Sequence, residues 1–163
     1  MRVYPEKAFL LSIFTLSFAT VLAKPSYPPQ MSDARAFTYK EASQTELKLW
    51  VVQSEKQTKA GKRPAIVFFF GGGWKGGTPA QFEKQCQYLA SRGMVAITAD
   101  YRVSSRHQTK ATACVEDGKS AVRWIRQNAS KLGIDRDKVA AGGGSAGGHV
   151  AAAIATIDGF ESQ

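Results

Sequence analysis

The sequence predicts an α/β fold with a mostly parallel sheet. Segments with strand-like and helix-like apolar patterns alternate along the chain, which requires crossover connections between parallel strands. The run 65–70 is apolar without interruption, as in a strand covered on both faces. The composition agrees, because 44% of the 163 residues are hydrophobic and 21% are charged, as in an ordinary globular domain.

Strands are predicted where apolar residues alternate with polar ones or run together. They are expected around Phe37 and Tyr39 and over the ranges 47–51, 65–70, 95–99 and 138–141.

Helices are predicted between these strands. The first spans 78–91, with Thr78 as N-cap, Pro79 at the first helical position and Gln81 completing a capping box. A longer helix spans 110–132, and a small-residue helix spans 145–156. Cys86 and Cys114 fall on apolar stripes of the first two helices, which favours two free thiols in the core.

The N-terminus has the pattern of a cleaved export signal. Basic residues flank a short apolar run, and the small residues before position 24 suit a signal peptidase, so we expect residues 1–23 to be a signal peptide cut after Ala23. The run is too short and too polar for a stable membrane anchor. The protein is then secreted or periplasmic, with an extended arm over 24–35 and one domain over 36–163. The net charge of +9 is spread along the chain, which argues against a nucleic-acid partner.

The segment Gly143-Gly144-Ser145-Ala146-Gly147 fits the G-x-S-x-G pattern of a nucleophilic serine. It lies between a predicted strand and a predicted helix, where the serine occupies a strained turn and glycines on both sides avoid the neighbouring backbone. Ser145 is the candidate nucleophile, and the Ala146 N–H can stabilise an oxyanion at the helix N-terminus. The alternative is a turn whose small residues serve tight packing alone.

A second glycine cluster, Phe70-Gly71-Gly72-Gly73-Trp74, ends the apolar strand. With it the chain resembles the α/β-hydrolase superfamily, in the branch of esterases and lipases that carry a His-Gly-Gly-Gly-Trp oxyanion motif, such as hormone-sensitive-lipase-like and acetylxylan or feruloyl esterase-like members. The resemblance covers about 47–156, through FFFGGGW, ITADYR and GGGSAGGH. It implies that Gly72 and Gly73 join Ala146 in the oxyanion hole. It also implies a small-molecule or carbohydrate ester substrate, with no cofactor and no metal.

Two residues depart from the pattern of that branch. Phe70 stands where His is usual, so a hydrogen bond that braces the glycine loop is expected to be absent. Gly144 stands where relatives often carry an acidic residue, which is expected to loosen the turn.

The glycines also allow a second interpretation. Gly71-x-Gly73-x-x-Gly76 and Gly142-x-Gly144-x-x-Gly147 both satisfy the dinucleotide-binding fingerprint, with Asp100 as the acid that would bind a ribose. This interpretation is disfavoured, because Thr78-Pro79 starts the helix beyond the glycines and the serine turn would remain unexplained.

A serine nucleophile needs a base and an acid, which follow it in the chain order of this fold. After Ser145 the sequence offers only His149, Asp158 and Glu161, and nothing that resembles the strands on which the family carries these groups. The second hypothesis is therefore that the chain is the truncated N-terminal half of such an esterase, a partial α/β-hydrolase domain over 36–163 that is catalytically incompetent because it lacks the triad Asp and His. In the strand order of that family the sheet continues beyond 138–141, so the resemblance implies that this strand is an exposed edge through which we expect chains to be able to associate.

Other polar residues are weaker candidates. His149 lies one turn after Ser145 and is expected to face the packed interior, whereas His107 is expected in a loop at the same sheet edge as Ser145. Asp100 is expected to brace Arg102 or the glycine loop, and Asp117 is expected to be a charge on a helix face.

Overall fold

The computed structural model describes residues 27–42, 44–54 and 62–159. The predicted signal peptide and Glu161 lie outside these residues. The fold is a five-stranded mixed sheet in the order β1-β2-β4-β3-β5. Its strands are β1 (Ala34–Ala42), β2 (Thr45–Val52), β3 (Arg63–Phe69), β4 (Val95–Ala99) and β5 (Ile134–Gly143).

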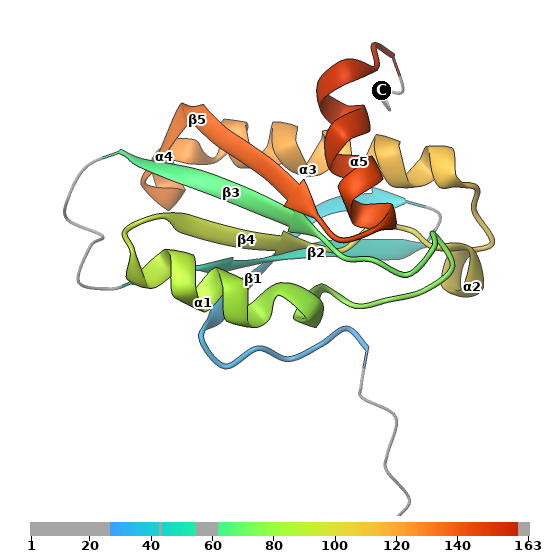
Figure 1. Cartoon of the computed structure of the whole chain (residues 1–163), viewed down its shortest axis with the longest axis horizontal. Coiled ribbons are helices and arrows are strands. Elements are labelled where there is room, and N and C mark those ends of the chain that lie inside the picture. Colours follow the sequence, from blue (N-terminus) through green and yellow to red (C-terminus); the bar gives the residue numbers. More distant parts are fainter. Residues whose placement is uncertain (1–26, 43, 55–61, 160–163) are drawn as a thin grey trace, which may run out of the picture.

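The sheet combines an antiparallel hairpin with a parallel region. β1 pairs antiparallel with β2, and β2 pairs antiparallel with β4, while β4, β3 and β5 run parallel. The carboxyl ends of β3, β4 and β5 therefore meet at one edge, from which α2 and α5 continue (Figure 1). Within the described residues β5 pairs with β3 alone, as predicted for an edge strand.

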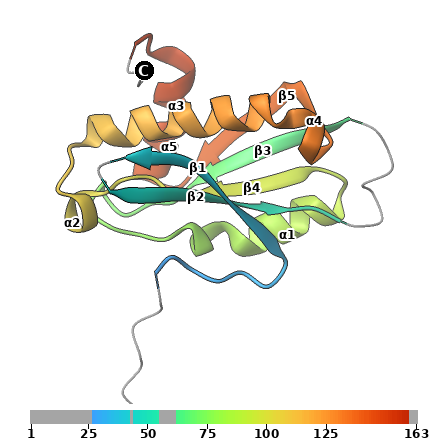
Figure 2. The same cartoon turned by 180° about the vertical axis from the view of Figure 1, so that it is seen from behind.

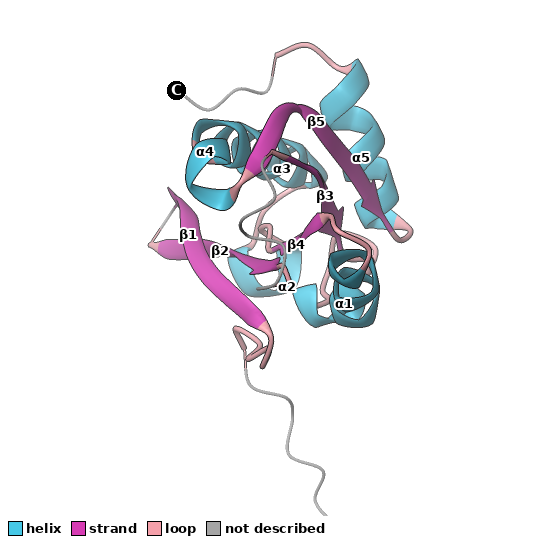
Figure 3. Cartoon of the chain, turned by 90° about the vertical axis from the view of Figure 1, so that its left-hand side faces the viewer, coloured by secondary structure: helices cyan, strands magenta, loops and turns pink. Residues whose placement is uncertain are grey.

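Helices cover both faces of the sheet (Figure 3). A 3₁₀ turn (Pro79–Phe82) and α1 (Glu83–Ser91) pack on one face. On the other face lie α3 (Ala111–Gln127) and α5 (Ala146–Thr156), which also contact each other (Figure 2). Two short helices complete the fold, α2 (Ser104–His107) and α4 (Ala129–Leu132).

The sheet separates two apolar cores. The larger one, between the sheet and α3, includes Val67, Phe69, Ile97 and Ile125, all fully buried. Cys114 belongs to this core and Cys86 to the smaller core under α1, so the two thiols lie on opposite faces of the sheet, buried and free as predicted. Burial raises the pKa of the Cys86 thiol to about 12 and that of Cys114 to about 11.

The predicted element boundaries need three corrections. The helix expected over 110–132 is interrupted at Asn128, whose side-chain amide and backbone N–H both bind the carbonyl oxygen of Trp124. The strand expected over 138–141 extends from Ile134 to Gly143, because it pairs with β3 along that length. β1 begins at Ala34, within the range expected to be an extended arm.

The prediction for Asp117 is wrong. Its side chain is fully buried, because Asp117 faces the sheet from α3. It accepts hydrogen bonds from Lys40 Nζ at 2.9 Å and from the backbone N–H and guanidinium of Arg102 at 2.8 to 2.9 Å. These bonds raise the pKa of Arg102. Asp117 thus joins β1, α3 and the segment after β4.

Candidate active site

Ser145 occupies the tight turn between β5 and α5. Its backbone has φ 50° and ψ −117°, a strained conformation for a residue with a side chain. Ser145 is the N-cap of α5, yet its side chain makes no capping hydrogen bond, and the residue is exposed. The hydroxyl is therefore presented to solvent at the positive end of the helix dipole.

Glycines at positions 143 and 147 permit this turn, as predicted. A β-carbon on Gly147 would lie 2.0 Å from the carbonyl oxygen of Phe69, and one on Gly143 would lie 2.4 Å from the carbonyl carbon of Gly147. Gly144 is different, because a β-carbon there meets only side chains at ordinary distances of 3.6 Å and more. A side chain at this position is sterically compatible with the turn.

The glycine loop after β3 lies directly against the serine turn. A β-carbon on Gly71 would lie 2.8 Å from the carbonyl oxygen of Gly144 and 3.4 Å from Cβ of Ser145. The loop closes on itself, since the N–H groups of Lys75 and Gly76 both donate to the carbonyl oxygen of Gly72. Gly72 and Gly73 have positive φ values of 139° and 61°.

The N–H groups of Gly72, Gly73 and Ala146 are free for a ligand. Among the residues that the structure describes, none of the three donates a hydrogen bond. They belong to the two segments that meet at Gly71 and Ser145. Unused backbone donors of this kind at a helix N-terminus and in a glycine turn are typical of sites that bind negative charge.

Gln81 braces the glycine loop, a role that the sequence interpretation missed. Its Oε1 accepts the N–H of Gly71 at 2.6 Å. The predicted capping box is therefore wrong, although Thr78 does cap the 3₁₀ turn through the N–H of Ala80. A side-chain acceptor in the following helix thus holds the first residue of the loop.

Phe70 fills its position as an apolar residue. Its ring is fully buried and stacks on Tyr101 with 4.1 Å between ring centroids, and the Tyr101 hydroxyl donates to the Phe70 carbonyl oxygen. Histidine at this position would bring a polar ring against Tyr101. The loop is therefore held by contacts other than a side-chain hydrogen bond from residue 70.

His149 does not face the interior, which corrects the prediction. Val150 and Gly147 occupy the buried face of α5, so His149 is turned away from the sheet and is exposed. Its ring meets Trp74 edge-on, with 5.4 Å between ring centroids. This ring contact between His149 and Trp74 therefore connects α5 to the glycine loop.

His107 lies in α2 rather than in a loop. Its Nδ1 accepts the N–H of Val103 at 2.9 Å, so one ring nitrogen is already engaged. Burial, together with the charge of Arg106, lowers the pKa of His107. The neutral ring supports the start of α2.

Asp100 follows β4 and is almost completely buried. It accepts the N–H of Tyr101 at 2.8 Å and lies 3.6 Å from Arg106, while Arg102 pairs with Asp117 instead. The expected contact with Arg102 is therefore wrong, and the link of Asp100 to the glycine loop runs through Arg106. A buried carboxyl is also unsuited to bind a ribose, so the dinucleotide interpretation loses its acid.

Burial raises the pKa of Asp100 from 3.8 to about 6, and the charge of Asp117 adds to this rise. The hydrogen bonds from Tyr27 and the Tyr101 N–H and the charge of Arg106 favour the carboxylate and oppose the rise. Between these two values the folded chain holds a proton that the unfolded chain has lost. Stability therefore falls as the pH rises from about 4 to 6, by a contribution on the order of 3 kcal/mol.

We expect Asp100→Asn to flatten this dependence. The measurement is the free energy of urea unfolding from pH 4 to 8 for the wild-type chain, for Asp100→Asn and for the exposed control Asp137→Asn. Equal slopes for wild type and Asp100→Asn between pH 4 and 6 would contradict the assignment.

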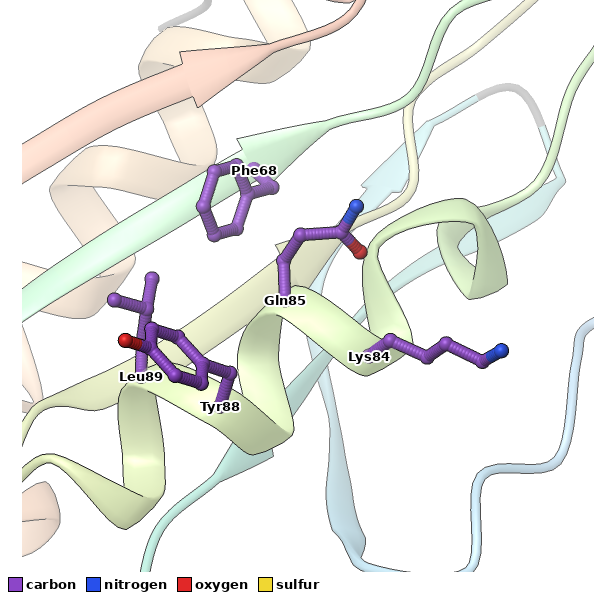
Figure 4. Close-up of a pocket in the computed structure, with 5 residues that line it drawn as sticks. All are labelled: Phe68, Lys84, Gln85, Tyr88 and Leu89. Carbon is purple, nitrogen blue, oxygen red and sulfur yellow. The ribbon is translucent and has the colours of Figure 1, made fainter.

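A pocket of about 430 Å³ lies elsewhere, between β3 and α1. It is lined by five residues, Phe68, Lys84, Gln85, Tyr88 and Leu89 (Figure 4). None of these residues belongs to the serine turn or the glycine loop.

In the described part of the chain, no cluster of three or more His, Cys, Asp or Glu residues could hold a metal ion. No helix there is long and apolar enough to cross a bilayer.

The chain is similar to a known protein family and to several esterases. Residues 52–163 match the family BD-FAE. Carboxylesterase NlhH of Mycobacterium tuberculosis is 32% identical over 95 residues, covering 58% of this chain and 29% of that protein. Esterase LipC of the same organism is 39% identical over 90 residues, covering 55% of this chain and 22% of that protein.

A solved structure is similar over more of the chain. Est2, a thermophilic esterase of the Planctomycetes species Thermogutta terrifontis, is 54% identical with a TM-score of 0.77, and the match covers 80% of this chain and 46% of Est2. The chain thus spans less than a third of these curated relatives and about half of Est2. Because the family match extends over more than half of its residues, this chain belongs to the BD-FAE family, of the α/β-hydrolase type.

Proposed function

We propose that this chain carries the nucleophile and the oxyanion hole of a serine carboxylic ester hydrolase. The observation that carries the proposal is the strained, exposed Ser145 at the start of α5, in direct contact with a glycine loop. Strain at a residue with a side chain is costly and is typically kept where it serves chemistry. The similarity to esterases and carboxylesterases supports the same reaction class.

Each group has a defined role in this reaction. Ser145 Oγ attacks the ester carbonyl carbon, and the N–H groups of Gly72, Gly73 and Ala146 stabilise the negative charge on the carbonyl oxygen. The ester C–O bond then breaks, the alcohol leaves with a proton, and an acyl group remains on Oγ. Water hydrolyses this acyl group to release the carboxylic acid and restore the serine.

The general base is assigned to neither described histidine. The Nδ1 atom of His107 is occupied by the Val103 N–H, and the ring of His149 packs against Trp74. The base and its acid would belong to the part of the family fold that this match does not span. A chain with the serine turn intact but without a competent base is the second candidate, and it is favoured by the occupied Nδ1 atom of His107.

The proposed substrate is a small ester with a short acyl group. Structures of Est2 hold propionate and butyrate, and Est2 is phosphorylated by paraoxon. These ligands support a short acyl chain in the proposed site of this chain, and the reaction of Est2 with paraoxon supports an organophosphorus probe as its test.

A fluorophosphonate probe tests the proposal. In labelling, Oγ forms a bond to phosphorus, fluoride leaves and the serine proton passes to a base or to solvent. We expect the wild-type chain to be labelled and Ser145→Ala to lose the label completely, because the label needs this oxygen. Intact mass spectrometry and peptide mapping measure the outcome.

Ser91→Ala is the matched control, since Ser91 is an exposed serine at the end of α1. Its label should equal that of the wild type. Absence of label from a folded wild-type chain would support the second candidate, and label that persists in Ser145→Ala would exclude Ser145 as the nucleophile.

A further inference from the structure

Arg106, in α2, contacts three separate segments of the chain. Its Nη1 donates to the carbonyl oxygen of Gly77 at 2.9 Å, and its Nη2 donates to the hydroxyl oxygen of Tyr27 at 2.9 Å. The same Nη2 lies 3.6 Å from Oδ1 of Asp100. One guanidinium thus connects the end of the glycine loop, the N-terminal arm and the carboxyl end of β4.

The arm that supplies Tyr27 is held along its length. From the start of β1 it runs back toward the end of the molecule that carries α2 (Figure 2). Asp33 accepts a hydrogen bond from Gln87 of α1 at 3.1 Å, and Met31 is buried. At its first described residue, the Tyr27 ring lies under the guanidinium of Arg106, with 3.9 Å from Cζ to the ring centroid.

Arg106 binds the glycine loop at Gly77, where the two ends of the loop pack together. Gly77 has φ 115°, and a β-carbon there would lie 2.3 Å from the carbonyl oxygen of Gly71 and 2.4 Å from the Phe70 ring. The last residue of the loop is therefore packed against the first. Restraining Gly77 also restrains Gly71, which directly precedes the proposed oxyanion donor Gly72.

The backbone of the same segment holds the middle of the loop. The N–H of Ser104 donates to the carbonyl oxygen of Trp74 at 2.9 Å, and that of Ser105 donates to Lys75 at 3.1 Å. Arg106 adds a charge-assisted hydrogen bond, which is stronger than a neutral one. Since Phe70 cannot brace the loop by a side-chain hydrogen bond, these contacts and Gln81 replace that support.

We infer that Arg106 is a positioning residue for the oxyanion hole and that Tyr27 of the N-terminal arm fixes its guanidinium. The inference rests on the proposed function for the role of the loop. Its geometric part concerns only how the loop is held, so it can be tested separately from the chemistry.

The experiment combines hydrogen exchange with probe labelling on the full chain. The variants are Tyr27→Phe, which removes only the hydroxyl, Arg106→Gln, and Arg106→Lys, which keeps the charge. We expect the amides of Lys75 and Gly76 to exchange roughly 10-fold faster in Arg106→Gln, with smaller increases in the other two variants. The maximal labelling rate of Ser145 should fall in the same order, while the half-saturating probe concentration stays unchanged.

Arg92→Gln is the matched control, because Arg92 stacks on Tyr88 at 5.3 Å as Arg106 does on Tyr27, but at the end of α1. It should leave loop exchange unchanged. Unaltered exchange at Lys75 and Gly76 in both Arg106 variants would overturn the inference. So would an equal loss of protection in β2 in Tyr27→Phe, since that would indicate a general structural role. If the wild-type chain is not labelled but loop exchange responds, the proposed chemistry fails and the positioning role stands.

Discussion

Gly147→Ala should abolish labelling of Ser145 and lower the free energy of unfolding by about 3 kcal/mol or more. The new β-carbon would lie 2.0 Å from the carbonyl oxygen of Phe69 and 2.5 Å from that of Phe70, both backbone atoms of the β3 end. Backbone cannot move aside as a side chain can. The turn must therefore separate from β3, which breaks the 3.3 Å hydrogen bond from Gly144 N–H to Phe69.

The expected loss of stability in Gly147→Ala is opposite to the usual effect of alanine in a helix. Gly147 lies in the first turn of α5, where alanine is ordinarily the better helix former by about 1 kcal/mol. A stabilising result in urea unfolding would mean that the contact with β3 is not tight. Gly144→Ala is the matched control in the same turn, because its β-carbon meets nothing closer than 3.6 Å, and it should keep both stability and label.

The serine turn was predictable because its cause is local. Gly143, Ser145 and Gly147 stand at spacings that only a strand-to-helix turn requires, and the apolar run before Gly71 identifies a buried strand. Glycines stand at the positions where a β-carbon would collide with the neighbouring backbone, so the sequence alone indicates this steric requirement. The fold class follows in the same way from periodicity, which depends on neighbouring residues.

The supports of the glycine loop were not predictable in this way. The spacing of Gln81 from Thr78 predicts a capping residue, yet the Gln81 side chain accepts a hydrogen bond from the N–H of Gly71, ten residues earlier in the chain. Arg106 and Tyr27 are 79 residues apart, and no periodic pattern connects them. His149 was misplaced because the position of Trp74 relative to α5 depends on the tertiary arrangement.

The burial of Asp117, in contrast, could have been predicted from the sequence. Asp117 follows Cys114 by three residues and precedes Ala121 by four, so it lies on the stripe predicted to be buried. A carboxylate on a buried stripe requires partners. Lys40 and Arg102 are distant in sequence, so the stripe indicates the need for cations but not their identity.

The second large effect is expected when the carboxylate that Lys40 and Arg102 share is removed. Asp117→Ala should lower the free energy of unfolding by roughly 3–5 kcal/mol, because it leaves the largely buried cations of Lys40 and Arg102 without their shared carboxylate. The loss reaches the site as well. Asp117 holds the backbone N–H of Arg102, two residues before Ser104, which binds the carbonyl oxygen of Trp74 in the glycine loop.

Urea unfolding of Asp117→Ala beside Glu116→Gln separates burial from charge. Glu116 is the neighbouring acid on α3 and is a third exposed, and it pairs with Arg102 through a single 3.0 Å contact, so its replacement should cost less than about 1 kcal/mol. Asp117→Asn should fall between the two, since one of the two acceptor oxygens remains as the amide oxygen. Equal losses for Asp117→Ala and Glu116→Gln would mean that net charge, and not the buried carboxylate, stabilises the junction of β1, α3 and the segment after β4.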